Sequence, residues 1–353
     1  MSHGLRCALS GKRHRVIPES FSSAAQPRMG PVDHRTGVWG TIAVAADDVY
    51  LLVSPASSTV GPVADDLLAA AQRWRTEGWA LVDGLIPGSE IDAVAGDLER
   101  LFATDTFADY NRCAGIGDGS PEGRQFRSKQ FNGMRGFPQP GCPVLNNLFV
   151  HPRLIEFARL ALDDDDLRIY QAAVWGKWAG EVNYEQPMHQ DGNHSLLPPR
   201  MEPGFWHLES FLYLSDVDGD CAPPRLVPRS RAAVAYGELY EHEVVATGRR
   251  GSLLAYRSDV WHRGTDFKRS DASRFVLVVA FRPAQADWFG YDAFPRLGGD
   301  ATFGSFAVGK SPAELALFGV PRPGHAYWTE ATVEAMAAKY PGLDVSPWRA
   351  ALG

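Results

Sequence analysis

The stretch QPMHQDGN, residues 186–193, contains two side chains that could bind a metal ion. His189 and Asp191 are two residues apart, and in an extended chain residues i and i+2 point to the same face. They would therefore offer one imidazole nitrogen and one carboxylate oxygen from the same side. A second imidazole would complete a 2-His-1-carboxylate facial triad, which leaves coordination positions open and suits non-haem Fe(II).

The best candidate for the second imidazole is His262, in SDVWHRGTDF. It closes a strand-like run and follows Asp191 at a distance that lets several strands return the chain across a β-sandwich. Arg274 opens the next apolar run, RFVLVVAFR. A hairpin through 263–273 would bring its guanidinium back near His262, where the planar fork could hold a carboxylate at two points. The order and spacing therefore predict one site.

The segment FWHLESF offers a competing pair, His207 and Glu209, with the same spacing. His207 lies inside an apolar strand, however, and no basic residue follows it as Arg274 follows His262. If this strand lines the cavity, Glu209, Phe211 and the nearby Trp206 are candidates for contact with a substrate. The alternative is an ordinary strand with a solvated glutamate and aromatic core residues.

Short aromatic and β-branched segments bounded by Gly, Pro, Asp and Ser must position these residues. They predict a mainly β, largely antiparallel core with flanking helices, and they are DLRIYQAAVWGKWAG, FWHLESFLYLSDVD, PPRLVP, GSLLAYRSDVWHRG and RFVLVVAFRP. Helical spacing predicts a helix that carries Leu67, Leu68, Ala71 and Trp74, a second from Ser89 to Leu101, and a third over 152–162. Residues 104–150 otherwise favour loops. Two further helices are expected near the C-terminus, with Ser311 and Thr329 as N-caps.

The composition narrows the class of partner. A net charge of −7 and a pI near 5.8 argue against nucleic-acid binding and favour a small-molecule substrate. The four cysteines are far apart and form no CxxC pair, which fits a reducing, cytoplasmic location. The most apolar early stretch, residues 41–54, is interrupted by Asp47 and Asp48, so no membrane segment is expected.

At these motifs the chain resembles the phytanoyl-CoA dioxygenase family of Fe(II)- and 2-oxoglutarate-dependent oxygenases. MHQDGN resembles the family's HxD segment, and WHRGTDF with SRFVLVV resembles its distal histidine and following arginine. LYLSDVDGDCAPPRLVPRS is similar to the segment between them, and EGWALVDGLIPGSEIDAVAGDLERLF to the family's usual N-terminal entry. The likeness covers about residues 63–284.

The resemblance implies a fold, a cofactor set and an activity. The fold would be a double-stranded β-helix, a jelly-roll of the cupin type, with His189, Asp191 and His262 as the iron ligands. Arg274 would bind the distal carboxylate of 2-oxoglutarate, and Lys177 would face the cosubstrate or the substrate. With Fe(II), 2-oxoglutarate and O₂, the enzyme would hydroxylate a C–H bond of a small molecule and release succinate and CO₂.

The sequence is expected to comprise three parts. Residues 1–62 lack sustained periodicity and are expected to form a poorly ordered extension. Residues 63–290 would form the jelly-roll oxygenase domain, and residues 291–353 a helical accessory segment.

Two alternatives use the same residues. A zinc hydrolase could activate a water with the three ligands, but it would have no need of Arg274 and would turn over without oxygen or 2-oxoglutarate. A non-catalytic jelly-roll binding protein would bind iron or a ligand and release no succinate.

Overall fold

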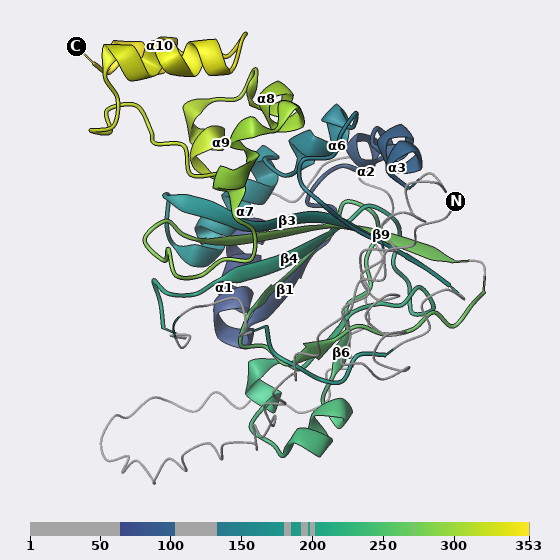
Figure 1. The fold of residues 1–353 in the computed structure, drawn as a ribbon. Helices are drawn as coiled ribbons and strands as arrows, with labels where there is room; N and C mark the ends of the chain where they lie inside the picture. Colours follow the sequence, from purple (N-terminus) through teal and green to yellow (C-terminus); the bar gives the residue numbers. More distant parts are fainter. Residues whose placement is uncertain are drawn as a thin grey trace, which may run out of the picture. The chain divides into compact units, whose positions relative to one another are not determined.

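The computed structural model describes residues 64–102, 133–179, 185–191, 197, 202–270 and 272–352. The predicted extension, residues 1–62, lies outside these ranges. Two sheets dominate the described part: one of six strands, in the order β1-β7-β4-β9-β3-β2, and one of three, in the order β6-β5-β8 (Figure 1). The strands are β1 (Trp79–Val82), β2 (Met134–Gly136), β3 (Leu167–Trp178), β4 (Leu208–Tyr213), β5 (Arg225–Leu226), β6 (Val244–Val245), β7 (Leu253–Arg257), β8 (His262–Arg263) and β9 (Ser273–Pro283).

Successive strands alternate between the two sheets. From β3 in the larger sheet the chain passes through His189, which bridges β8 of the smaller sheet, and then returns to β4. It crosses again to β5 and β6, back to β7, across to β8 and back to β9. Every pairing among these described strands is antiparallel. This alternation is that of a double-stranded β-helix, so the predicted jelly-roll is confirmed.

The larger sheet is apolar on both faces. Because successive side chains of a strand point to opposite faces, Val174, Leu212 and Leu277 pack outward with helices α1 (Ala64–Glu77) and α7 (Pro152–Leu162). The alternate residues, including Ala173, Tyr213, Leu254 and Val276, form an inner cluster with Leu226 of the smaller sheet. The space between the two sheets is therefore where inward polar side chains gather.

Two helices lie where the sequence predicts them. In α1, Leu67, Ala71 and Trp74 recur at helical spacing and are fully buried. Helix α7 begins after His151, whose side chain accepts a hydrogen bond from the Arg153 N–H, and it has proline at its first position. These helices cover the outer face of the larger sheet (Figure 1).

The predicted helix from Ser89 to Leu101 is instead divided into α2 (Gly88–Asp92) and α3 (Ala95–Leu101). Downstream, α6 (Pro143–Leu148) forms within the stretch for which loops were expected. The start of α6 has a long-range cap, because the carboxylate of the buried Asp97 in α3 accepts the N–H of Leu145 at 2.9 Å, in the first turn of α6. This cap comes from a distant segment, so no local pattern could indicate it.

The first C-terminal elements, up to Phe318, share the core of the larger sheet, whereas α10 and α11 pack in a separate apolar cluster. Phe318 stacks on Phe137 with ring centroids 5.0 Å apart, and the Ile169 N–H of β3 donates to the Leu317 carbonyl at 2.8 Å. Ser311 and Thr329 cap helices as predicted, each in a capping box. The elements are the 3₁₀-helix η4 (Phe294–Gly299) and helices α8 (Ala301–Ala307), α9 (Pro312–Ala316), α10 (Glu330–Lys339) and α11 (Ser346–Ala350). Two further 3₁₀-helices, η2 (Arg229–Arg231) and η3 (Tyr236–Glu241), follow β5.

Two sequence expectations concern cysteines and membranes. Cys142 and Cys221 are buried free thiols, and the other two cysteines lie outside the described residues. In the part of the chain that the structure describes, no helix combines the length and apolar character needed to cross a membrane.

Candidate metal centre

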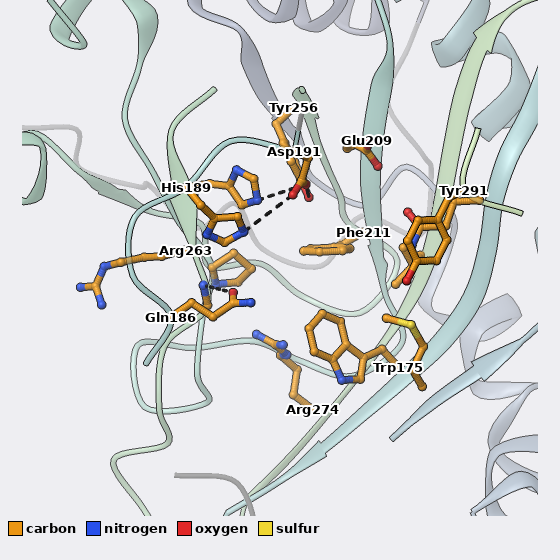
Figure 2. Close-up of a pocket in the computed structure, with 16 residues that line it drawn as sticks. Trp175, Gln186, His189, Asp191, Glu209, Phe211, Tyr256, Arg263, Arg274 and Tyr291 are labelled. Carbon is orange, nitrogen blue, oxygen red and sulfur yellow. Dashed lines mark hydrogen bonds and ion pairs between the residues drawn. The ribbon is translucent and has the colours of Figure 1, made fainter. Parts of the chain in front are cut away.

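His189, Asp191 and His262 come together between the two sheets. One ligand atom from each lies within 4.8 Å of the other two. The Asp191 carboxylate faces both imidazoles, with Oδ2 3.2 Å from His262 Nε2 and Oδ1 3.7 Å from His189 Nε2. A search of the described residues for clustered metal-binding side chains finds this group. The three residues singled out in the sequence therefore meet at one point (Figure 2).

Backbone pairing holds this group in place. His189 and His262 exchange two backbone hydrogen bonds of 2.9 Å, and the Asp191 N–H donates to the Ser258 carbonyl at 3.1 Å. The HxD segment thus runs as an edge strand beside β8. Its alternation places the side chains of His189 and Asp191 on the same side.

The outer nitrogens of both imidazoles face backbone carbonyls. His189 Nδ1 lies 2.9 Å from the Pro187 oxygen, and His262 Nδ1 lies 2.9 Å from the Val260 oxygen. Because a carbonyl can only accept, each Nδ1 carries the proton of the neutral imidazole, which leaves Nε2 as the ring nitrogen that faces Asp191. This is the tautomer that metal binding through Nε2 requires.

The charges at the site differ between the two histidines. Burial, and then the neighbouring His262, lower the pKa of His189. Burial also acts to lower the pKa of His262, but the facing Asp191 carboxylate and its hydrogen bond raise it overall. Tyr256 Oη donates to Asp191 Oδ2 at 3.2 Å, and burial together with Asp191 raises the pKa of Tyr256, so it remains a protonated donor.

The same cavity contains Arg274, at the start of β9 (Figure 2). The residue is only 3% exposed. Its Nη1 donates to the Ala222 carbonyl, its Nε has no partner within the described residues, and no described carboxylate forms an ion pair with it. Burial lowers the pKa of Arg274 to about 10, against smaller opposing effects from Tyr213 and Cys221. At neutral pH the cavity therefore holds a buried cation, which favours an anionic ligand.

Lys177 lies behind Arg274 rather than on the cavity wall. The two residues are direct partners across the β3–β9 pair, so they share the inner face of the sheet. The Lys177 ammonium donates to the Thr265 carbonyl and lies 5.7 Å from the Phe267 ring centroid. Burial, and then the charge of Arg274, lower the pKa of Lys177 to about 7, while Asp266 oppositely raises it.

The competing pair does not form a metal group with other described residues. His207 is buried and stacks on Phe289 with ring centroids 3.3 Å apart, and burial followed by the charge of Arg282 lowers its pKa to about 3. Its strand neighbours Glu209 and Phe211 do line the cavity.

Trp206, predicted as a substrate contact, is not among the described residues that line this cavity. Its ring meets Trp74 edge to face at 5.9 Å and lies 4.6 Å from the Arg257 guanidinium. It packs in the outer layer between α1 and the sheet, because it precedes β4 and its indole is large and apolar.

The cavity residues that sequence reasoning missed include Gln186, Tyr256 and Tyr291. Gln186 accepts the Gly264 N–H through Oε1 at 2.7 Å and so joins the HxD segment to the turn after β8. Tyr256 shares the inner face with Leu254, so the alternation in LLAYR could have found it. Tyr291 comes from the predicted accessory segment, and no local signal places it here.

Comparisons with known proteins gave structural neighbours only. No family model and no curated protein matches the chain. SnoN, a non-heme alpha ketoglutarate dependent epimerase from nogalamycin biosynthesis, is similar at 20% identity, covering 62% of this chain and 83% of that chain, with a TM-score of 0.48. EctD from S. alaskensis is similar at 16% identity, covering 67% and 84%, with a TM-score of 0.48.

HygX from Streptomyces hygroscopicus, solved with nickel and 2-oxoglutarate bound, is similar at 16% identity, covering 64% of this chain and 95% of that chain, with a TM-score of 0.43. At such identities and TM-scores, these likenesses establish no activity for the present chain.

Proposed function

We propose that the protein is a non-haem Fe(II)- and 2-oxoglutarate-dependent oxygenase, of the kind that the phytanoyl-CoA dioxygenase motifs indicate, and that it hydroxylates a small molecule. His189, Asp191 and His262 would hold the metal. Two imidazoles and one carboxylate that converge on one point match the donor set of the facial triad, and this donor set fits Fe(II). When bound, Fe(II) and O₂ supply the oxidative decarboxylation of 2-oxoglutarate to succinate and CO₂, coupled to oxidation of a C–H bond.

The observation that carries the proposal is Arg274. A buried guanidinium without a carboxylate partner among the described residues is costly, and an anionic ligand would offset that cost. A metal site alone has no use for it. A cosubstrate with a keto-acid end for the metal and a second carboxylate for the arginine uses both features of the cavity.

Different residues of the cavity would hold the metal, orient the cosubstrate and exclude water. The three ligands fix one face of the metal, and Arg274 orients the far end of the cosubstrate through a charge-assisted hydrogen bond. Trp175 and Phe211 form apolar walls that exclude water from the same space. Lys177, behind Arg274, would add positive charge at the cosubstrate end.

An anaerobic titration of the purified protein with Fe(II) and 2-oxoglutarate tests the proposal. We expect a visible metal-to-ligand charge-transfer band, lost in His189→Ala and weakened in Arg274→Ala. With O₂ and a substrate, succinate should form. A folded, iron-loaded protein without the band would contradict the proposal. Turnover of an ester or amide with zinc and without oxygen would then favour the hydrolase, and ligand binding without turnover the binding protein.

A further inference from the structure

The side-chain amide of Gln171 lines the metal-site cavity and has no hydrogen-bond partner among the described residues. Gln171 lies on β3 and is 8% exposed, and its backbone pairs with Ala280 of β9. A carboxamide has two N–H donors and one acceptor oxygen, and a buried polar group that lacks a partner lowers stability. An amide in this position therefore indicates a ligand with hydrogen-bonding atoms.

A β-bulge directs Gln171 toward the cavity. The register of the β3–β9 pair shifts between Ile169 and Gln171, so Tyr170 is an extra residue on β3. Such a bulge re-aims side chains, and bulges are common beside functional sites. Ile169 packs in the outer apolar cluster, whereas Tyr170 and Gln171 both face inward. The Tyr170 hydroxyl donates to Glu209 Oε1, which leaves the Gln171 amide to face the cavity.

The segment after β9 holds this bulge in place. The Tyr170 carbonyl accepts the N–H groups of Tyr291 at 3.1 Å and Asp292 at 2.8 Å. The Asp292 carboxylate in turn accepts the Ala172 N–H at 3.0 Å. These hydrogen bonds fix the backbone on both sides of Gln171, so the fold itself directs the amide into the cavity.

Gln171 lies at the end of the cavity opposite Arg274. The cross-strand partner of Arg274 is Lys177, six residues beyond Gln171 on β3, and the rise of a strand puts about 20 Å between the two positions. Figure 2 shows Glu209, which bonds to the neighbouring Tyr170, at the opposite end of the drawn pocket from Arg274. If the Arg274 end receives the cosubstrate, as the proposed function requires, the Gln171 end is left for the substrate.

The row of inward side chains that begins with Gln171 ends beside the metal group. Gln171 pairs with Ala280, and the β4–β9 register places Glu209 opposite the same alanine. Glu209 pairs with Tyr256 of β7, whose hydroxyl donates to Asp191. Neighbouring strands lie about 4.8 Å apart, so three strand spacings put Gln171 about 14 Å from Tyr256. A small molecule held at Gln171 can therefore extend to the metal group.

A ligand group that both donates and accepts hydrogen bonds satisfies a carboxamide best. An ammonium group can only donate and a carboxylate can only accept, so each would leave part of the amide unpaired. Trp175, Phe211 and Val278 line the same cavity and would contact an apolar skeleton. We propose that Gln171 is a specificity-determining residue of the proposed oxygenase, and that its substrates are small, largely apolar molecules that carry a hydroxyl or carboxamide group. This assignment rests on the proposed function.

Binding of matched probes to the full-length protein tests this assignment. Isothermal titration calorimetry at pH 7 would compare benzamide and benzyl alcohol with toluene, which has the same ring and no hydrogen-bonding group. Each probe is titrated into the metal-free protein and into the protein with Fe(II) and 2-oxoglutarate under argon. Gln171→Met keeps the length of the side chain and removes the amide, and Gln171→Leu is the second variant if the first does not fold. Gln72→Met, at an exposed position of α1, is the matched control.

We expect Gln171→Met to weaken the binding of benzamide, benzyl alcohol or both by about tenfold or more, the effect of two hydrogen bonds, and to leave toluene binding unchanged. Gln72→Met should change neither. Because the substitution removes a buried polar group without a partner, the melting temperature should not fall. A lower melting temperature in both Gln171 variants would assign the amide a structural role instead. No binding of either polar probe, or equal losses for the polar probes and toluene, would overturn the assignment and leave the amide hydrated by water alone.

The charge-transfer titration distinguishes this result from the fate of the proposed function. A band in the wild type without probe binding that depends on Gln171 would remove only the assignment of Gln171. Probe binding that depends on Gln171 without a band would support the polar contact and contradict the oxygenase.

Discussion

His189 and His262 form a two-residue antiparallel bridge, each N–H donating to the carbonyl of the other at 2.9 Å, with their imidazole centroids 4.4 Å apart. Both side chains therefore leave the same face of a hydrogen-bonded backbone pair. Their Nδ1 atoms are held by carbonyls two residues earlier in each segment. The proposed metal site is thus positioned by the hydrogen-bonded backbone of the sheet.

The first prediction concerns His189. His189→Ala should weaken Fe(II) binding by more than about a hundredfold, because loss of a ligand exceeds the effect of losing an outer partner. The side chain of His189 is 33% exposed, so the metal-free protein should keep its melting temperature. Metal content after anaerobic reconstitution and thermal unfolding measure the two effects. His242→Ala is the control, and equal iron content in both variants would remove His189 from the ligand set.

Tyr256 should act on the metal through Asp191. Tyr256→Phe deletes the 3.2 Å hydrogen bond to Asp191 Oδ2 and leaves the ring packing against His262 in place. Because such outer partners orient a ligating carboxylate, we expect about a tenfold to hundredfold loss of Fe(II) affinity. Competition with a coloured chelator measures it. An unchanged affinity would mean that the Tyr256 hydrogen bond does not orient the Asp191 carboxylate for the metal.

Arg274 should show opposite effects on binding and stability. Arg274→Met removes the cosubstrate's partner, so 2-oxoglutarate affinity should fall about a hundredfold or more. It also removes a buried cation that has no ion pair with the described residues, so without 2-oxoglutarate the free energy of unfolding should stay unchanged or rise by up to about 3 kcal/mol. Arg274→Lys, which lacks the planar fork, should bind at an intermediate level.

Denaturant unfolding and calorimetry separate the two quantities. A loss of stability above about 1 kcal/mol in Arg274→Met, comparable to an ordinary hydrogen bond, would show that the arginine has a structural purpose.

Lys177 should make cosubstrate binding depend on pH. Its pKa lies near 7 in the protein without ligand, set by burial, by Arg274 on β9, and by Asp266 and Glu185 in opposition. An arriving anion favours the protonated amine, so 2-oxoglutarate affinity should be highest below pH 7 and fall above it, by at most about tenfold per pH unit.

Replacing Lys177 by methionine should flatten this profile between pH 6 and 8.5. The same substitution should also change how the free energy of unfolding depends on pH. The pKa of Lys177 is lowered in the folded state, so above about pH 7 the unfolded state binds more protons than the folded state. The free energy of unfolding of the wild type should therefore rise as the pH increases above about 7, and that of the variant should not. If 2-oxoglutarate affinity and the free energy of unfolding depended on pH in the same way in the wild type and the variant, both expectations would be contradicted.

Local patterns in the sequence were sufficient for the residues that strands position. The i, i+2 spacing of His189 and Asp191 and the place of Arg274 at the head of an apolar run follow from strand alternation. Tyr170 lies on β3 and Glu209 on β4, and their contact depends on how the strands are ordered in the sheet. The order β4-β9-β3 places one strand between them, and alternation alone does not specify it.

Long-range capping limited the helix predictions in the same way. Helix α6 was not predicted, because the cap on its first turn is the Asp97 carboxylate, which accepts the Leu145 N–H from 48 residues earlier in the chain. Tyr291 reaches the cavity because its N–H and that of Asp292 both donate to the Tyr170 carbonyl. Each of these contacts joins segments that carry no mutual signal in the sequence.

The C-terminal segment is attached to the jelly-roll by both apolar and polar contacts, and we expect the apolar contacts to contribute more to stability. Phe318 is 6% exposed and its ring lies within 5.9 Å, centroid to centroid, of Phe137, Phe294, Phe303 and Phe306. Phe318→Ala would leave a cavity among these rings and should lower the free energy of unfolding by about 3–5 kcal/mol.

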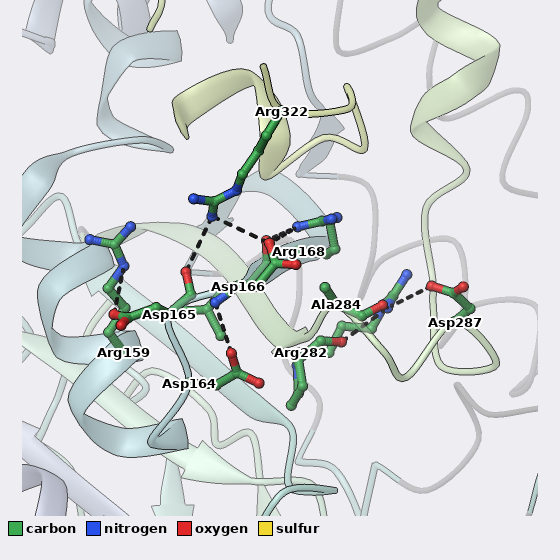
Figure 3. A network of polar contacts seen from close by, with 11 residues as sticks. Arg159, Asp164, Asp165, Asp166, Arg168, Arg282, Ala284, Asp287 and Arg322 are labelled. Carbon is green, nitrogen blue, oxygen red and sulfur yellow. Dashed lines mark hydrogen bonds and ion pairs between the residues drawn. The ribbon is translucent and has the colours of Figure 1, made fainter. Parts of the chain in front are cut away.

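Arg322 makes the polar contacts nearby, with the Asp165 carbonyl and the Asp166 carboxylate at 3.3 Å each (Figure 3). These groups are largely exposed, and water screens their charges, so Arg322→Ala should cost less than about 1 kcal/mol. Denaturant unfolding of both variants measures the contrast. If Phe318→Ala lowered the free energy of unfolding as little as Arg322→Ala, the buried phenylalanine would contribute no more than a solvated ion pair. The aromatic cluster would then not be what attaches the C-terminal segment to the jelly-roll.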